Sequence, residues 1–406
     1  MRVSKRARWA LVIVAAAALA LAATAAARTH SAAAKKPIVI GWAHDDAQGP
    51  MGPFDLPALA AAQIEKAKLN KKGGVNGHKI VIKTCDTQKD DPTASKACAD
   101  QLISEGAKII FTTCDVNLAA PVVQEAVKSH LLTVAPCIGT DQLGPKFGFC
   151  GGTKLCFSFG NVAQDEGSAM AQLAWDHGWK TADLAKDTAI IYFRAVINAF
   201  KARFTQLGGK INYETTYLDK QFGGNNVQNA VTGVNAHKAA VVVTATAGAW
   251  QSLAPLITGM RTAGNKTPVL NSWAGDGTYW LPQSPQVTNY WFVTYANAFG
   301  GDPNKTVRAL AKQVKAGTGG FITGPAAIDG VALAFERDGG SLVGTKLAAV
   351  MEKFHKVPTI SGKVSFSKKL HSVFGRAYRV IEINNNKPIE KGEVTAKKVP
   401  NSPDQP

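Results

Sequence analysis

The chain has 406 residues, with 46 Lys and Arg against 29 Asp and Glu, which gives a formal net charge of +17. This length suggests two domains of ordinary size. The basic residues are spread along the sequence and form no arginine-rich stripe. This even distribution argues against a nucleic-acid-binding surface, even though the net charge is high, and favours solvated basic faces.

The first 27 residues have the order of a secretory signal peptide. The stretch "MRVSKRAR" is basic, "WALVIVAAAALALAA" is uncharged and apolar, and an A-x-A pattern ends at Ala27. The alternative is a membrane anchor, but the apolar run is shorter than the roughly 20 residues that a bilayer span needs. We therefore predict a cleaved signal peptide over 1–27, although cleavage could occur as late as residue 34. The mature protein is then expected to be extracytoplasmic. No later segment is long and apolar enough to span a membrane.

Apolar strands and amphipathic helices alternate in the first part of the chain. Strands are predicted over 37–43, 78–86, 107–113 and 131–137, and helices over 56–70, 92–105 and 118–130. Asp55 is predicted to cap the first helix. Strands that alternate with helices of this length indicate βαβ units and a parallel sheet.

The alternation restarts after residue 160. Helices are predicted over 160–179, 193–206, 224–236 and 249–263, and strands over 181–187, 210–218, 239–247, 267–273 and 289–296. Three helices, over 304–315, 325–337 and 343–355, and strands over 363–367 and 375–389 follow. The polar residues 397–406 are predicted to form a disordered tail. The pattern as a whole predicts an α/β protein with two lobes.

The sequence lacks the motifs of the common cofactor-binding and catalytic sites. No G-x-G-x-x-G follows the first strand, no G-x-x-x-x-G-K-[ST] is present, and no G-x-S-x-G nucleophile elbow occurs. The six cysteines form no C-x-x-C pair and histidines near them are sparse, which favours disulfides over a metal site. We predict no catalytic residues, no cofactor and no metal, and a cleft that binds a small molecule.

Three stretches resemble the type I periplasmic binding proteins of the branched-chain amino acid class. They are the "GP.G" loop over 49–52, "GGVNGHKI" over 73–80 and "KARFTQLGGKI" over 201–211, and the similarity covers about 37–392. The resemblance implies two Rossmann-like, doubly wound lobes joined by three crossover segments. Ligand would then sit in the cleft at the carboxyl ends of the strands.

The same resemblance implies how the chain divides and what it does. It assigns 37–157 plus 297–360 to lobe 1, and 158–296 plus 361–396 to lobe 2. The implied function is capture of a small polar ligand, an amino acid or an amide-like compound, for delivery to the permease subunits of an ABC importer. We expect a monomer without enzymatic activity. The alternatives are a sensory ligand-binding protein that acts on a membrane receptor, and an exported hydrolase, which the missing motifs disfavour.

Positions at strand ends identify the candidate ligand contacts. They are Gln48 (beside Asp45 and Asp46), Asp115, Asn117, Ile138, Gly139, Thr140, Tyr192, Trp250 and Asp276. By resemblance, Tyr192 matches a ligand-contacting tyrosine, and Asp276 lies near the acidic position that holds an ammonium group in amino acid binders. Where the family has a run of serines, this chain has Asp115, Val116 and Asn117. The ligand could therefore also be a cation, an amide or an aromatic compound.

Other interpretations of these candidates also stay open. Asp115 could cap a helix, and Trp250 and Trp273 could be core residues rather than walls of the pocket.

The family's strand order, two-one-three-four-five, also bears on the cysteines. It makes strands three and four neighbours, so that Cys114 and Cys137 end side by side. With two local pairs, the resemblance favours the bridges Cys85–Cys98, Cys114–Cys137 and Cys150–Cys156. A bridge between Cys85 and Cys114 is the rival, among 15 possible pairings of six cysteines.

Overall fold

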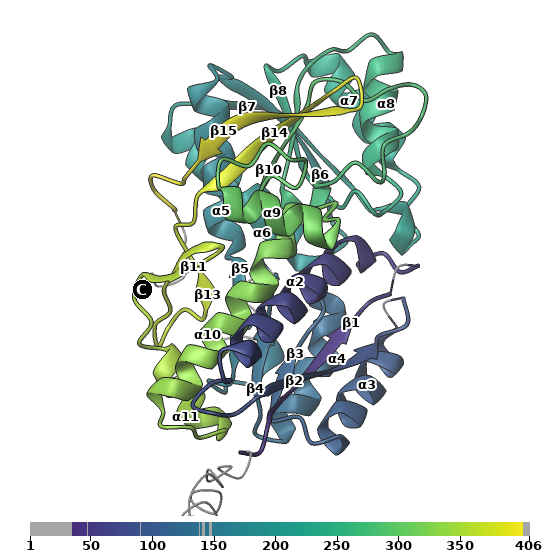
Figure 1. Ribbon diagram of the computed structural model, residues 1–406. Helices are drawn as coiled ribbons and strands as arrows, with labels where there is room; N and C mark the ends of the chain where they lie inside the picture. The colour runs from purple at the N-terminus through teal and green to yellow at the C-terminus, as the bar shows by residue number, and fades with distance from the viewer. Residues whose placement is uncertain are drawn as a thin grey trace, which may run out of the picture.

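The computed structural model describes residues 35–46, 48–89, 91–137, 139, 143–145 and 148–400. The predicted signal peptide and the last six residues of the predicted tail lie outside the described residues. The chain folds into two α/β lobes, each built on one large, mostly parallel sheet (Figure 1). The predicted fold class, two doubly wound lobes, is confirmed.

The first lobe is built on a parallel sheet with strand order β13-β5-β4-β3-β1-β2 among the described residues. Its strands are β1 (Ile38–His44), β2 (Ile80–Asp86), β3 (Ile109–Phe111), β4 (Leu132–Ala135), β5 (Cys156–Asn161) and β13 (Ser372–Val373). Its helices are α2 (Gly52–Lys71), α3 (Pro92–Ser104), α4 (Val116–Lys128), α10 (Thr323–Arg337) and α11 (Gly344–Met351). Apolar residues of α3 and α4 pack on one face, and those of α2, α10 and α11 on the other.

The second lobe has the order β15-β14-β10-β9-β8-β6-β7 in the described part of the chain. Its strands are β6 (Thr181–Asp187), β7 (Lys210–Tyr217), β8 (Val241–Ala245), β9 (Val269–Asn271), β10 (Tyr290–Thr294), β14 (Tyr378–Asn384) and β15 (Lys387–Val394). Its helices are α5 (Ala163–Asp176), α6 (Ile191–Gln206), α7 (Val227–His237) and α8 (Leu253–Thr262). The β14–β15 hairpin pairs antiparallel to β10, at the edge of an otherwise parallel sheet (Figure 1).

Two strands of the first sheet differ from the sequence-based expectation. β5 was not predicted, and the helix expected over 160–179 begins only at Ala163, because β5 runs to Asn161. β13 comes from the segment assigned to lobe 2, yet it pairs with β5. A strand of two residues is too short to show any apolar period. The pairing therefore departs from the predicted division at residue 361.

The three segments that cross between the lobes meet in a buried polar group, which we call the hinge cluster: Asn161, Asp165, Tyr295, Arg376 and Tyr378. The Asn161 backbone N–H donates to the Tyr295 hydroxyl (3.2 Å), and its side-chain amide donates to Asp165 (3.1 Å). The Tyr378 hydroxyl also donates to Asp165 (3.4 Å), and Arg376 donates to the Phe159 carbonyl of β5 (2.7 Å). Hydrogen bonds thus join the first crossing segment to both of the others.

The described helices were compared with the length and apolar character that a membrane span requires. None of them alone is both long and apolar enough to cross a bilayer, and one pair, α9 (Lys305–Val314) with Gly319–Arg337, meets the criterion only when taken together across a bend of 110°.

Close packing of α10 on α2 yields a prediction for stability. A Cβ at Gly324 would lie 2.1 Å from the Ala58 carbonyl oxygen, so the helix backbones are in contact there. We expect Gly324→Ala to lower the free energy of unfolding by about 1–3 kcal/mol, as overpacking does, although alanine is the better helix former by about 1 kcal/mol. Urea denaturation measures this change.

The matched control is Gly317→Ala. Its added methyl group would meet no atom within 4 Å, so the urea midpoint should stay close to that of the wild type. Equal stability of the Gly324→Ala variant and the wild type would contradict the close approach of the two helices.

Candidate functional site

The loops that follow the strands of both sheets converge on one cavity between the lobes. Its lining comes from the ends of β1, β3 and β4 in the first lobe and of β6, β8 and β9 in the second. The lining residues are Met51, Phe54, Cys114, Asp115, Gly139, Ile190, Tyr192, Phe193, Ala247, Trp250, Trp273 and Ala274. This is the edge at which open α/β sheets bind ligands. We call it the cleft cavity.

The cleft cavity is small, about 30 Å³. A space of this size holds on the order of two water molecules. Aromatic side chains of the two lobes fill much of the cleft: Phe54 packs edge-on against Trp273, with ring centroids 5.0 Å apart. A solute of several heavy atoms can enter only when these rings, or the lobes that carry them, move apart.

Asp55 organises the rim contributed by the first lobe. Its buried carboxylate accepts hydrogen bonds from the Asp45 N–H (2.8 Å), the Thr113 hydroxyl (2.5 Å) and the Cys114 N–H (2.7 Å). Burial raises the pKa of Asp55 to about 7, against the lowering effect of these donors. The sequence predicted a cap for the α2 helix here, but α2 begins at Gly52 and Asp55 lies in its first turn. Its carboxylate instead ties the ends of β1 and β3 to α2.

Asp45 holds the loop after β1 rather than facing the cavity. Its fully buried carboxylate accepts from the backbone N–H groups of Asp46, Met51 and Lys89. Gly49 permits this arrangement, because a Cβ at that position would lie 2.0 Å from the Asp45 carboxylate oxygens. The loop therefore delivers Met51 and Phe54 to the cleft.

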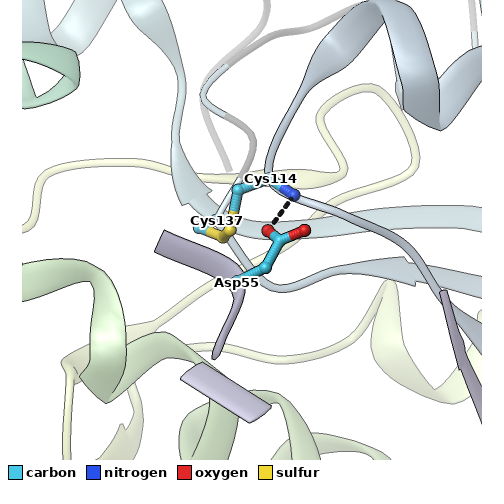
Figure 2. Close-up of side chains that lie close together, drawn as sticks. All are labelled: Asp55, Cys114 and Cys137. Atoms are coloured by element: carbon cyan, nitrogen blue, oxygen red, sulfur yellow. Dashed lines mark hydrogen bonds between the residues drawn. A yellow bond between two sulfur atoms is a disulfide. The ribbon is translucent and has the colours of Figure 1, made fainter. Parts of the chain in front are cut away.

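The structure joins all six cysteines, which lie among the described residues, as Cys85–Cys98, Cys114–Cys137 and Cys150–Cys156. These are the pairs that the resemblance favoured. In Figure 2 the Cys114–Cys137 bridge lies beside Asp55, whose carboxylate accepts the Cys114 N–H. Asp55 and the two sulfurs lie close enough together to hold a metal ion. Metal ligation by cysteine requires a thiolate, however, so the bridge fits a fixed rim and not a metal centre.

Glu166 organises the wall contributed by the second lobe. It lies fully buried in the first turn of α5, where one carboxyl oxygen accepts the Tyr192 hydroxyl (2.8 Å) and the other accepts the Trp273 backbone N–H (2.7 Å). Burial raises the pKa of Glu166 to about 8, more than these two hydrogen bonds lower it. One carboxyl group thus fixes two aromatic residues that line the cleft cavity.

The aromatic wall includes two indole groups with unused donors. Trp250 packs edge-on against Phe193 (5.2 Å between centroids), and Trp273 stacks on Tyr295 (5.3 Å). The Nε1 atoms of Trp250 and Trp273 are buried and have no hydrogen-bond partner among the described residues. A buried N–H without an acceptor is costly, so these two donors suit an acceptor group brought in by a ligand.

Four of the predicted site residues line the cleft cavity. They are Asp115, Gly139, Tyr192 and Trp250, and Trp273, left open between core and pocket, joins them. At Gly139 a Cβ would lie 3.1 Å from the Tyr192 ring. The absence of a side chain there lets the β4 loop approach the second lobe.

The other predicted residues lie elsewhere or are not described. Gln48 is exposed and lines an open groove with Lys89 and Trp280, outside the cleft cavity. Ile138, Thr140 and the side chain of Asn117 lie outside the described residues.

Asp276 does not line the cleft cavity. Its fully buried carboxylate accepts the Thr294 hydroxyl (2.5 Å) and the Gly319 N–H (2.6 Å), and burial raises its pKa to about 7. It therefore joins the segment after β9 to the end of β10 and to the 3-10 turn Gly319–Ile322. Asp276 lies beyond β9 and the turn Trp273–Gly275 that follows it, and position along the sequence could not give the direction in which its side chain points.

Sequence reasoning also missed Glu166 and Phe54. Glu166 stood inside a predicted amphipathic helix, where an acidic residue in the first turn is ordinary. The available signal was the pair Asp165–Glu166 at the start of a helix that is otherwise rich in alanine. The sequence gives no sign that these two carboxyls are buried.

Comparisons with known proteins agree with this geometry. The family model of the periplasmic binding proteins matches residues 37–388, and the chain belongs to that family. No curated protein sequence matches it.

Solved structures with the same fold include LivJ from Streptococcus pneumoniae in complex with isoleucine (16% identity, TM-score 0.73, covering 88% of this chain and 99% of that one). The leucine-binding protein LivK from Thermotoga maritima is 18% identical, with a TM-score of 0.73 and coverage of 88% and 99%. A solute-binding protein of an R. palustris ABC transporter, in complex with 4-hydroxybenzoate, is 16% identical, with a TM-score of 0.74 and coverage of 90% and 98%.

The raised pKa of Glu166 predicts a pH dependence of stability. The folded protein holds this proton up to about pH 8 and the unfolded chain only up to about 4.5. The group's contribution is therefore complete below pH 4.5 and is lost as the pH rises to 8. Its slope is at most about 1.4 kcal/mol per pH unit. We expect Glu166→Gln to flatten the fall of the unfolding free energy between pH 5 and 8, measured by urea titration at several pH values.

Glu336→Gln, on the exposed side of α10, is the control and should keep the wild-type slope. If the Glu166→Gln slope also equals that of the wild type, the pKa of Glu166 is not raised by burial.

The Cys114–Cys137 bridge gives a second prediction. It closes a loop of 23 residues, and a loop of this size is worth about 3 kcal/mol in the chain-entropy model. We expect the double variant Cys114→Ala/Cys137→Ala to lose about that much stability in urea denaturation under oxidising conditions. A reductant should then lower the urea midpoint less in the variant than in the wild type, and an equal loss in both would contradict the pairing.

Proposed function

We propose that this protein is an extracytoplasmic solute-binding protein that captures a small ligand between its lobes and delivers it to an ABC importer. One observation carries the proposal: the ends of strands from both sheets line a single cavity, with side chains of each lobe in contact across it. A ligand held by both lobes favours the closed arrangement. The importer can then distinguish the loaded protein from the empty one.

Family membership supports an extracytoplasmic location and a transporter as partner. The signal peptide over 1–27 and the permease subunits as direct partners are parts of the proposal, as is a monomeric state. We propose binding without catalysis. The cleft cavity offers Asp115 and Tyr192 as its titratable lining groups within the described chain, and Tyr192 is already bonded to Glu166.

The lining favours a ligand with an apolar or aromatic body and one acceptor group. Met51, Phe54, Ile190 and Phe193 surround the space with apolar surface. The indole N–H groups of Trp250 and Trp273, which lack partners in the described structure, supply donors to an acceptor such as a carboxylate. Isoleucine and 4-hydroxybenzoate, present in complexes of the structural relatives, both join an apolar body to a carboxylate.

Asp115 bears on whether the ligand is an amino acid or an aromatic acid. It is a buried carboxyl on the cavity wall, and a carboxylate there would favour the ammonium group of an amino acid. An aromatic acid brings no such cation and would instead use the aromatic wall for stacking. Because Asp276 lies outside the cavity lining, Asp115 is the acidic residue that we assign to ligand selection.

A binding panel tests this proposal. Branched-chain amino acids, benzoate and 4-hydroxybenzoate are titrated into the mature chain by calorimetry, with thermal shift as a second measure, since a ligand of the folded state raises the melting temperature. We expect at least one of these carboxylates to bind. We also expect Trp250→Phe or Trp273→Phe to weaken that ligand about tenfold or more, because a hydrogen bond to a charged group is worth about 1.5–3 kcal/mol.

The matched control is Trp280→Phe. Its Nε1 is likewise buried without a partner among the described residues, but the side chain lines the open groove instead of the cleft cavity. Affinity should be unchanged in this variant. An equal loss in all three variants would place the ligand elsewhere, and no binding by any member of the panel would overturn the proposed ligand class.

A further inference from the structure

A second cavity lies at the hinge, separate from the cleft cavity and larger, at about 220 Å³. The crossing segment after β10 and the one before β14 line it, together with the hairpin of β11 (Val357–Thr359) and β12 (Gly362–Val364). Its polar lining includes Asp302, Asn304, Ser361, Arg376 and Arg379. We call it the hinge cavity, and nothing in the capture of a solute by the cleft requires it.

Arg376 brings an unusual charge to this cavity. Its side chain is only 5% exposed. Nη2 donates to the Phe159 carbonyl, whereas Nε and Nη1 have no hydrogen-bond partner in the described part of the chain. A guanidinium carries five N–H donors and cannot be neutralised by losing its proton. Burial of such a charge without a matching anion is strongly unfavourable.

The acidic residues nearby do not neutralise Arg376. Asp302 is already engaged by the Asn297 and Asn304 N–H groups and by Arg379 (3.3 Å). Glu393 pairs with Arg379 as well. Asp165 attracts Arg376 electrostatically, but no ion pair joins the two among the described residues, and burial raises the pKa of Asp165 to about 7. Burial therefore disfavours the charged form of Asp165, which weakens it as a counter-ion for Arg376.

We propose that the hinge cavity binds a small oxyanion, a carboxylate or an inorganic sulfate or phosphate, on the guanidinium of Arg376. The planar fork of N–H donors matches the oxygen spacing of such anions. Ser361 and Asn304 line the same space and can add hydrogen bonds. The aromatic ring of Tyr295, 5.0 Å from the guanidinium carbon, covers another side of the cation.

This site lies at the hinge, where movement of the lobes would change the surroundings of a bound anion. Arg376 lies in the third crossing segment, the Phe159 carbonyl that it holds lies in β5 just before the first, and Tyr295 follows β10 in the second. An anion on Arg376 therefore binds where all three segments meet. If its affinity differs between the open and closed arrangements, it changes the affinity of the cleft for solute by the same factor in return.

Thermal unfolding of the mature chain in series of sulfate, phosphate, acetate and chloride at equal ionic strength tests the proposal without any cleft ligand. Excluded salts such as sulfate raise the midpoint without saturating, whereas a site gives a component that saturates. We expect a saturable rise with at least one oxyanion and none with chloride. The acetate and sulfate series separate a carboxylate site from an inorganic one.

The decisive variant is Arg376→Lys, which keeps the charge and removes the planar fork. We expect its half-saturating oxyanion concentration to rise about tenfold or more. Arg261→Lys is the matched control, because Arg261 is a partly buried arginine whose donors all bond to backbone carbonyls. The half-saturating oxyanion concentration of Arg261→Lys should equal that of the wild type. No saturable component in the wild type, or an equal one in Arg376→Lys, would overturn the site.

A crystal of the unsubstituted protein grown in selenate keeps the test informative if Arg376→Lys does not fold. An anomalous peak within hydrogen-bonding distance of the Arg376 guanidinium would support the site. Peaks confined to surface lysines would overturn it. None of these results depends on the identity of the cleft ligand, so the two proposals can fail separately.

Discussion

The hinge cluster is the constraint on which the rest of the structure depends. Asp165 accepts from Asn161 in the first crossing segment and from Tyr378 at the start of β14, and Asn161 donates to Tyr295 in the second. Strand pairing lies within each of the two large sheets. The relative position of the two sheets, however, and so the shape of the cleft, depends on three short segments that meet at one point. A buried polar cluster of this kind favours a few discrete arrangements over a continuous range.

The residue that fixes the cleft wall of the second lobe is the next one in the chain after Asp165 of this cluster. Glu166 follows Asp165 in the first turn of α5, and its carboxyl group holds Tyr192 and the backbone of Trp273. A buried carboxyl group has the same role in the first lobe, where Asp55 ties the ends of β1 and β3 to α2. Buried carboxyl groups thus position the two rims. Aromatic rings and Asp115 line the cleft cavity between these rims, and the indole N–H groups of Trp250 and Trp273 have no partner among the described residues.

Sequence reasoning was most successful where the signal is local and periodic. The alternation of strands and helices gave the α/β class, and the strand ends identified Asp115, Gly139, Tyr192 and Trp250, which line the cleft cavity. β5 and β13 were missed because one follows a cysteine- and glycine-rich loop and the other has only two residues. Asp276 and Glu166 show the other limit. Both are acidic residues near the cleft, but burial and side-chain direction decide their roles, and neither follows from spacing along the chain.

We propose that one solute is held by side chains of both lobes in the cleft cavity. The most direct measurement is a crystal structure of the mature protein with the solute that it binds. We expect an acceptor group of that solute on the indole nitrogen of Trp250 or Trp273, with Phe54 and Asp115 in contact from the other lobe. Solute density against one lobe alone, or in the open groove beside Gln48 and Trp280, would contradict it.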